Sequence, residues 1–275
     1  MRSSVEIHNI VTGETRVVWQ TERLVEAPNF SRDGRFLVIN GDGLLYRLSL
    51  DGSEPVQIDT GFATLCNNDH GLSPDGTLLA ISDKVEFGKS AIYVLPTEGG
   101  TPRLVTPNLP SYWHGWSPDG ETFAYCGIRG DVFDIYTIPV AGGEERRVTF
   151  GEGRNDGPDY SADGEWIYFN SSRTGHMQIW RVRADGSEPT RITDSPYGDW
   201  FPHPSPDGKH LLVLSYEGDV FDHPRDLDVR LRLMDMDGGN ARILLELFGG
   251  QGTMNVPNWS PDGTEFAFVR YAPAG

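Results

Sequence analysis

The stretch Ser161-Ala162-Asp163-Gly164, with the apolar run Trp166-Ile167-Tyr168-Phe169 shortly after it, is one copy of a unit that the chain repeats. Six copies of the tetrapeptide Ser-x-Asp-Gly recur at similar intervals, with their serines at Ser31, Ser73, Ser117, Ser161, Ser205 and Ser260. The intervals between these serines are 42, 44, 44, 44 and 55 residues. A period in the low forties that is rich in β-forming residues is typical of a radial array of four-stranded blades. The repeat therefore predicts a β-propeller.

The tetrapeptide itself has the composition of a turn. Serine in the first place, proline in the second and glycine in the fourth are preferences of a type I turn, and Ser73-Pro74-Asp75-Gly76 meets each of them. If the strands of a blade are lettered A to D outward from the axis, this turn joins strand A to strand B. No strand-to-helix turn follows the serines. We therefore interpret them as turn residues and not as nucleophiles.

Each end of the chain supplies half a blade. Val5–His8 and Arg16–Trp19 match strands C and D with no A or B before them, and residues 255–271 match A and B with no C or D after them. Pairing the two halves would leave no open sheet edge. The sequence thus predicts an all-β, six-bladed propeller, a single domain over residues 1–275, closed by N-terminal strands on C-terminal ones. The predicted blades cover about residues 22–60, 66–106, 110–150, 154–193, 198–246, and 252–271 together with 4–20.

The composition limits the classes of partner. The chain has 23 Lys and Arg residues against 40 Asp and Glu residues, a formal net charge of −17. This balance disfavours a nucleic-acid partner, because a phosphate backbone would be repelled. No apolar stretch is long enough for a transmembrane helix, so we expect no membrane insertion. Two scattered cysteines, Cys66 and Cys126, and the lack of an apolar leader predict a cytoplasmic protein if the chain is complete, or a periplasmic one if a signal peptide has been removed.

The repeat resembles that of a known family. The frame Pro/His-x-(Trp/Tyr/Phe)-Ser-Pro-Asp-Gly, then Ile-Tyr-x-(Ile/Leu), then Gly-Gly-x-x-x-Arg-x-Thr is similar to the propeller repeat of TolB-like proteins and extends from about Val5 to Tyr271. The resemblance implies a six-bladed propeller that binds a protein or another ligand, here without the N-terminal α/β domain of TolB. The repeats also resemble the propellers of prolyl-oligopeptidase-type peptidases, with no hydrolase domain attached.

A binding site is expected at one end of the ring. In a propeller the D–A and B–C connections share one face, and residues at the start of each strand A line the channel. Five of the seven histidines fall on this face, which also carries the long insertion Glu217–Asp228. Loops on a rigid scaffold are where binding residues collect. The predicted ligand-binding residues are Asp69, His70, Trp113, His114, Asp156, Arg173, Trp200 and His203.

Two functions compete for this face. The first is a non-catalytic module that binds a protein or a small molecule, such as a carbohydrate or a peptide, at the channel mouth. The second is a metal-dependent lyase or hydrolase with one divalent metal in the channel, resembling oligogalacturonate lyases. Imidazole suits transition metals, and the matching ligands would be His70, His114, His203 and Gln251. A histidine at the start of strand A can also serve the fold alone, by hydrogen bonding to the neighbouring blade.

Overall fold

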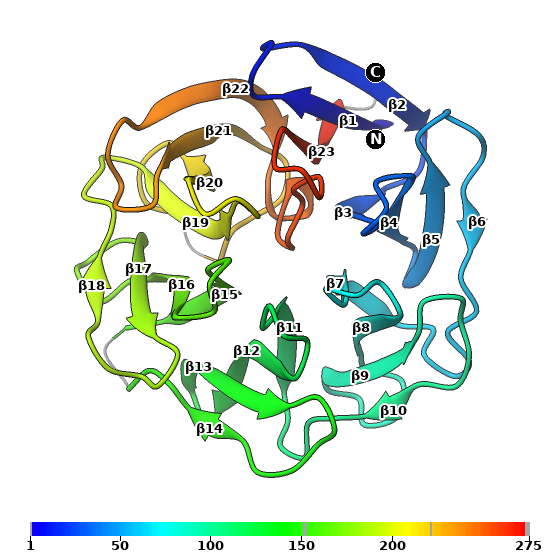
Figure 1. Ribbon diagram of the computed structural model, residues 1–275, viewed down its shortest axis with the longest axis horizontal. Coiled ribbons are helices and arrows are strands. Elements are labelled where there is room, and N and C mark those ends of the chain that lie inside the picture. Colours follow the sequence, from blue (N-terminus) through cyan, green and yellow to red (C-terminus); the bar gives the residue numbers. More distant parts are fainter. Residues whose placement is uncertain (1, 151–152, 221, 273–275) are drawn as a thin grey trace.

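Six antiparallel sheets stand around a common axis (Figure 1). The computed structural model describes residues 2–150, 153–220 and 222–272. The predicted domain 1–275 and the predicted insertion 217–228 extend over positions that lie outside these residues. The predicted all-β propeller of six blades is confirmed. The described segments contain one short 3-10 helix and no helix with the length and hydropathy of a membrane span.

Five sheets have four strands, and in each the first strand lies nearest the axis (Figure 1). The first blade comprises β3 (Glu26–Phe30), β4 (Phe36–Gly41), β5 (Leu44–Ser49) and β6 (Val56–Gln57). The second comprises β7 (Cys66–Leu72), β8 (Leu78–Asp83), β9 (Ala91–Pro96) and β10 (Arg103–Leu104). The third comprises β11 (Ser111–Trp116), β12 (Thr122–Arg129), β13 (Val132–Pro139) and β14 (Arg146–Arg147). The fourth comprises β15 (Asn155–Tyr160), β16 (Trp166–Ser171), β17 (Gln178–Arg183) and β18 (Thr190–Arg191). The fifth comprises β19 (Gly198–Pro204), β20 (His210–Tyr216), β21 (Leu227–Asp235) and β22 (Arg242–Gly249).

The sixth sheet joins the two ends of the chain. Strand β1 (Arg2–Asn9) pairs with β2 (Thr15–Thr21) on its outer side and with β23 (Glu265–Ala272) on its inner side. The register with β23 is unbroken, from Arg2 opposite Ala272 to Asn9 opposite Glu265. The ring is therefore closed by the N-terminal strands, as the sequence predicts.

The innermost position of the sixth sheet differs from the prediction. The segment before β23 forms the 3-10 helix η1 (Gln251–Thr253) and then only an isolated bridge, Trp259 opposite Phe266, so the described sheet has three strands. Backbone and side-chain bonds act together here: the Ala267 N–H donates to the Asn258 carbonyl oxygen at 2.9 Å, and the Asn258 Nδ2 atom donates to the Ala267 carbonyl oxygen at 2.7 Å. The segment thus occupies the inner position without a regular strand.

The repeated tetrapeptide builds the A–B turn through its serine. The Ser161 hydroxyl donates to Oδ1 of Asp163 at 2.6 Å and accepts from the Trp166 backbone N–H at 3.0 Å. The other copies make the same two bonds; for example, Ser205 donates to Asp207 at 2.6 Å. The serines are therefore occupied as turn residues. The next strand carries a continuous apolar run because it is buried on both faces between neighbouring blades, as all six residues of β4 are.

A β-bulge interrupts the innermost strand of each four-stranded blade. The register with the second strand shifts between Glu26/Asn29, Cys66/His70, Trp113/Gly115, Asp156/Asp159 and Trp200/His203. Three residues inside these bulges have positive φ, namely Ala27 (55°), Gly157 (58°) and Phe201 (49°). A bulge re-aims the side chains around it, because the two-residue alternation of the strand is broken there. The bulges therefore decide which side chains face the axis.

Candidate ligand-binding site

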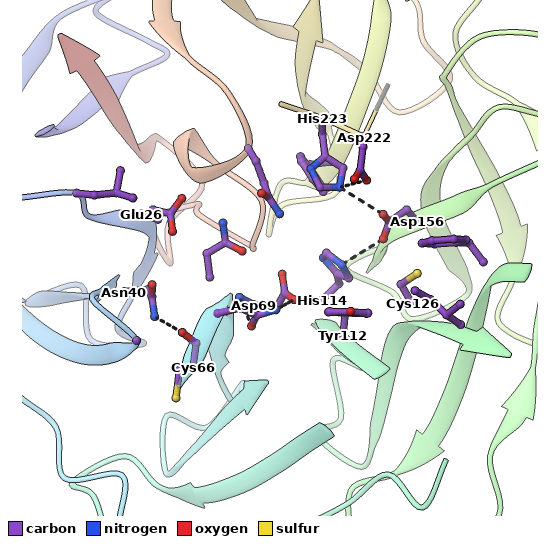
Figure 2. A pocket seen from close by; sticks show the side chains of 18 of the residues that line it. Glu26, Asn40, Cys66, Asp69, Tyr112, His114, Cys126, Asp156, Asp222 and His223 are labelled. Atoms are coloured by element: carbon purple, nitrogen blue, oxygen red, sulfur yellow. Dashed lines mark hydrogen bonds and ion pairs between the residues drawn. The ribbon is translucent and has the colours of Figure 1, made fainter. Parts of the chain in front are cut away.

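A cavity of about 630 Å³ opens at the end of the ring where the D–A and B–C connections meet. Its walls come from all five four-stranded blades and from the chain between β22 and β23 (Figure 2). The polar and aromatic side chains of the walls are Glu26, Asn40, Asp42, Asn67, Asn68, Asp69, Tyr112, His114, Phe133, Arg154, Asp156, Phe201, Asp222, His223 and Gln251. A volume of this size suits a small organic molecule or a short peptide segment.

Three basic side chains surround Asp156 on one side of the cavity (Figure 2). His114 Nε2 lies 3.5 Å from Asp156 Oδ1, and His223 Nε2 lies 3.7 Å from Asp156 Oδ2. The Arg154 guanidinium lies 3.5 Å from the same Oδ2 atom. Burial alone would raise the pKa of Asp156, but the contacts with His114 and His223 hold it well below its usual range. Asp156 is therefore an ionised carboxylate at neutral pH.

His114 is the counterpart of this carboxylate. Burial would lower the pKa of His114, but the neighbouring Asp156 and Asp69 outweigh it and raise the pKa above its usual value. The other ring nitrogen, Nδ1, lies 3.3 Å from the Asn255 carbonyl oxygen. The imidazole is thus held between two blades and the segment before β23, and it carries positive charge more readily than a free histidine.

The long connection between β20 and β21 contributes Asp222 and His223 to this side of the cavity. The Arg154 guanidinium lies 2.5 Å from Asp222 Oδ1, which ties the connection to the fourth blade. His223 packs edge-on against the Trp200 ring, with centroids 4.7 Å apart, and it also contacts Phe201. The insertion that lengthens the last interval of the repeat therefore covers part of the cavity.

Glu26, Asp42 and Asp69 place further carboxyl groups on the side formed by the first two blades, where Glu26 lies opposite Asp156 (Figure 2). The pKa of Glu26 is raised to about 7, chiefly by burial, with Arg225 opposing the rise and nearby Asp69 adding to it. Burial also raises the pKa of Asp69 to about 6, although His114 opposes this rise. The carboxyl groups of Glu26 and Asp69 therefore titrate near neutral pH, whereas Asp156 stays ionised.

Comparisons with known proteins agree on the family. The TolB β-propeller domain model matches residues 113–228. An uncharacterized protein of Agrobacterium fabrum is 72% identical over 274 residues, which is 99% of this chain and 94% of that protein. A solved structure of an Agrobacterium tumefaciens protein assigned to TolB is also 72% identical; it superposes with a TM-score of 0.98 over 100% of this chain and 99% of its own. The chain belongs to the TolB-like propeller family.

A more distant solved structure bears on the metal hypothesis. Oligogalacturonate lyase in complex with manganese superposes on this TolB-like propeller with a TM-score of 0.56 and 15% identity, over 95% of this chain and 70% of that one. A likeness at this level of identity concerns the fold alone. Any metal site in the present chain must therefore be judged on its own side chains.

Of the eight predicted ligand-binding residues, three line the cavity and five lie elsewhere in the described structure. Asp69, His114 and Asp156 are in its walls. His70 is fully buried, with Nε2 3.3 Å from the Val38 carbonyl oxygen of the first blade. Burial lowers the pKa of His70 to about 4, so this imidazole is neutral. His70 thus performs the inter-blade role that the sequence allows as an alternative.

The other four predicted residues pack between blades or behind the cavity wall. Trp113 is fully buried against Phe123 and against Gly71 of the second blade. Trp200 is fully buried behind His223. Arg173 donates to Ser171 and Asn155 and lies over the Trp180 ring. His203 is also buried, as its contacts show.

The proposed metal ligands do not form one set. His203 Nδ1 lies 3.1 Å from Asp159 Oδ2 and Nε2 lies 3.3 Å from the Met254 carbonyl oxygen, so both nitrogens face groups of the fold. Gln251 and His114 line the cavity, whereas His70 does not. Within residues 2–150, 153–220 and 222–272 there is no group of three or more His, Cys, Asp or Glu side chains arranged to hold a metal ion. The residues present do not fit the four-ligand metal site.

Several wall residues were missing from the predicted binding set, namely Glu26, Tyr112, Arg154, Phe201 and His223. Tyr112 and Phe201 are next to the predicted residues Trp113 and Trp200, and bulges break the alternation of these two strands. The sequence did contain one usable signal: Phe201 and His223 are on the predicted face, and His223 lies in the one insertion that departs from the 44-residue period.

Proposed function

We propose that this TolB-like propeller is a non-catalytic binding protein that takes a small molecule, or a peptide segment of a partner protein, into the cavity at the channel mouth. The observation that carries the proposal is the cavity itself, about 630 Å³ in volume and lined by ionisable side chains from five blades. The polar groups are held in place before any ligand arrives, since Asp156 is already fixed by His114 and Arg154. A preorganised site loses less entropy on binding.

The thiols of the cavity support binding over covalent catalysis. Cys66 and Cys126 both line the walls. Burial raises the pKa of the Cys66 thiol far above its usual value, and the pKa of Cys126 rises well above its usual value for the same reason. A thiol must be ionised to attack a substrate. Both thiols remain protonated and unreactive near neutral pH.

The alternative of a metal-dependent lyase or hydrolase has less support. It requires His70, His114, His203 and Gln251 to converge, and His70 and His203 instead contact the backbone of neighbouring segments. The likeness to oligogalacturonate lyase concerns the fold and gives no support to these four side chains as metal ligands. We therefore favour the binding protein.

A pair of matched histidine variants tests the binding function. The wild-type protein would be screened by thermal shift against sugars, amino acids and short peptides, and each ligand found would be titrated by calorimetry. His223→Ala removes a wall residue, whereas His210→Ala removes a histidine of strand β20 that does not line the cavity. We expect His223→Ala to weaken binding at least tenfold and His210→Ala to leave it unchanged. If both variants bind the ligand equally well, the binding site lies outside the cavity.

A further inference from the structure

The cavity is uneven in charge. On the side formed by the third to fifth blades, Arg154, His114 and His223 face the carboxylates of Asp156 and Asp222. The three basic side chains and the two carboxylates contact one another, so the carboxylates of this side have basic partners within the protein.

The side formed by the first two blades has no such balance. Glu26, Asp42 and Asp69 line it, and Arg154 on the far side is the one arginine or lysine among the described wall residues. Asp69 accepts hydrogen bonds from the neutral amides of Asn67, at 2.5 Å, and Asn255, at 2.8 Å. Neutral amides satisfy hydrogen bonds without supplying a counter-charge. His114 and His223 act on Asp69 but already contact Asp156, so the carboxyl groups of this side have only a partial counter-charge.

Arg225 is a cation that acts on Glu26, and it is already engaged. Its guanidinium lies 3.2 Å from Asp226 Oδ2, and 43% of its side chain is exposed to solvent. It opposes the rise in the pKa of Glu26 without cancelling it. The Glu26 carboxylate thus has a partial counter-charge at a distance and none from the cavity wall.

An orphaned acceptor lies beside the same carboxyl groups. The fully buried Asn255 amide donates from Nδ2 to Asn68 Oδ1 at 3.1 Å and to Asp69 Oδ1 at 2.8 Å. Its Oδ1 atom accepts no hydrogen bond from the described residues. Buried polar atoms normally have a partner. The acceptors on this side therefore outnumber the donors that the protein supplies.

We propose that the ligand of this cavity carries a cationic, hydrogen-bond-donating group, an ammonium or a guanidinium, that binds against Glu26 and Asp69. The inference rests on the binding function proposed above and adds the chemical class of the ligand. Such a group supplies both the positive charge and the N–H donors that this side lacks. The aromatic rings of Tyr112 and Phe201 give the less polar part of the ligand an apolar surface.

Binding of a cation here depends on pH. The titratable and charged groups that act on the two carboxyls are Arg225, Asp226 and Tyr271 around Glu26, and Tyr112, His114, Cys126, Asp156 and His223 around Asp69. Between pH 5 and pH 8 the carboxyls of Glu26 and Asp69 lose their protons, because burial raises their pKa values to about 7 and about 6. This change favours a cation. We expect the affinity to rise at least tenfold over this interval, with protons released on binding.

Calorimetry with defined probes tests the proposal. Agmatine and spermidine are the cationic probes, and galacturonate and citrate are the anionic ones, each titrated into the wild-type protein at pH 5 and pH 8. We expect the cationic probes to bind and the anionic ones not to. Glu26→Gln and Asp69→Asn keep the side-chain shape and should each weaken cation binding at least tenfold. Glu98→Gln, an exposed carboxyl 81% accessible to solvent, is the matched control and should leave it unchanged.

The outcomes separate this inference from the binding function. A ligand may lose affinity in His223→Ala yet bind Glu26→Gln as tightly as wild type. That result would refute the proposal that the ligand carries a cationic group, while the cavity would remain the binding site. Preferred binding of the anionic probes would do the same. If no compound of any class depends on the cavity variants, both proposals fail. If a variant unfolds, the pH dependence of the wild-type affinity is the remaining test of the cationic ligand. An affinity that falls toward pH 8 contradicts the inference.

Discussion

Glu26 should make the protein less stable as the pH rises, and replacing it should remove this effect. Burial raises the pKa of Glu26 from its ordinary value of 4.5 to about 7. The folded state therefore binds the proton more tightly than the unfolded state does. Stability from this group is fully present below pH 4.5 and is lost as the pH rises through 7. One pKa unit corresponds to about 1.4 kcal/mol, so the ionised carboxylate costs the fold about 3 kcal/mol at pH 8.

The test compares wild type with Glu26→Gln by urea unfolding, followed by tryptophan fluorescence, at pH 5 and pH 8. The variant cannot ionise, so we expect its free energy of unfolding to exceed that of wild type by about 2–3 kcal/mol more at pH 8 than at pH 5. For a chain of this size such a gain raises the melting temperature by roughly 5 °C. Glu98→Gln, on the surface, should show the same difference from wild type at both pH values. A pH-independent difference for Glu26→Gln would refute the idea that this carboxyl is buried without a sufficient counter-charge.

Three further substitutions test the fold and the site. Gly71→Ala should destabilise the protein by about 3 kcal/mol in urea unfolding, because the new Cβ would lie 2.1 Å from the Trp113 ring; near-neutral behaviour would mean that the ring moves freely. Ser161→Ala should cost about 1 kcal/mol through the lost turn hydrogen bonds and leave ligand binding intact, and loss of binding would contradict a purely structural serine. Asp156→Asn should lower the pKa of His114, which the carboxylate now raises; a histidine titration by NMR that shows no change would contradict the ion pair.

The architecture could be predicted from the sequence because it is encoded locally and repeatedly. Each copy of the turn satisfies its own hydrogen bonds, as Ser161 and Asp163 do. The half-blades at the two ends predict the closure between β1 and β23, since neither half is complete alone. Such signals do not depend on distant side-chain geometry.

The binding residues were harder to predict because bulges govern the inner strands. The sequence predicts both His70 and Trp113 at the channel, and the structure buries both between blades. Phe201 reaches the cavity with φ at 49°. The sequence does not indicate this conformation, because no turn-forming residue stands at this position. Conversely, the bulge glycine Gly157 allows close packing, since a Cβ there would lie 2.6 Å from Asn170 Oδ1. The face was predictable, but the individual side chains on it were not.

The pairing of β1 with β23 has a consequence for synthesis on the ribosome. Strand β1 is made before the other strands of the ring, yet its inner partner β23 begins only at Glu265 and is the last of the described strands to be made. Until then its inner edge has unpaired N–H and C=O groups that can recruit another nascent chain. Long separations between contacting residues also slow folding. A circularly permuted variant with its new termini in one of the D–A connections, between two blades, would build every sheet from consecutive strands. It would remove this waiting time and should aggregate less during translation.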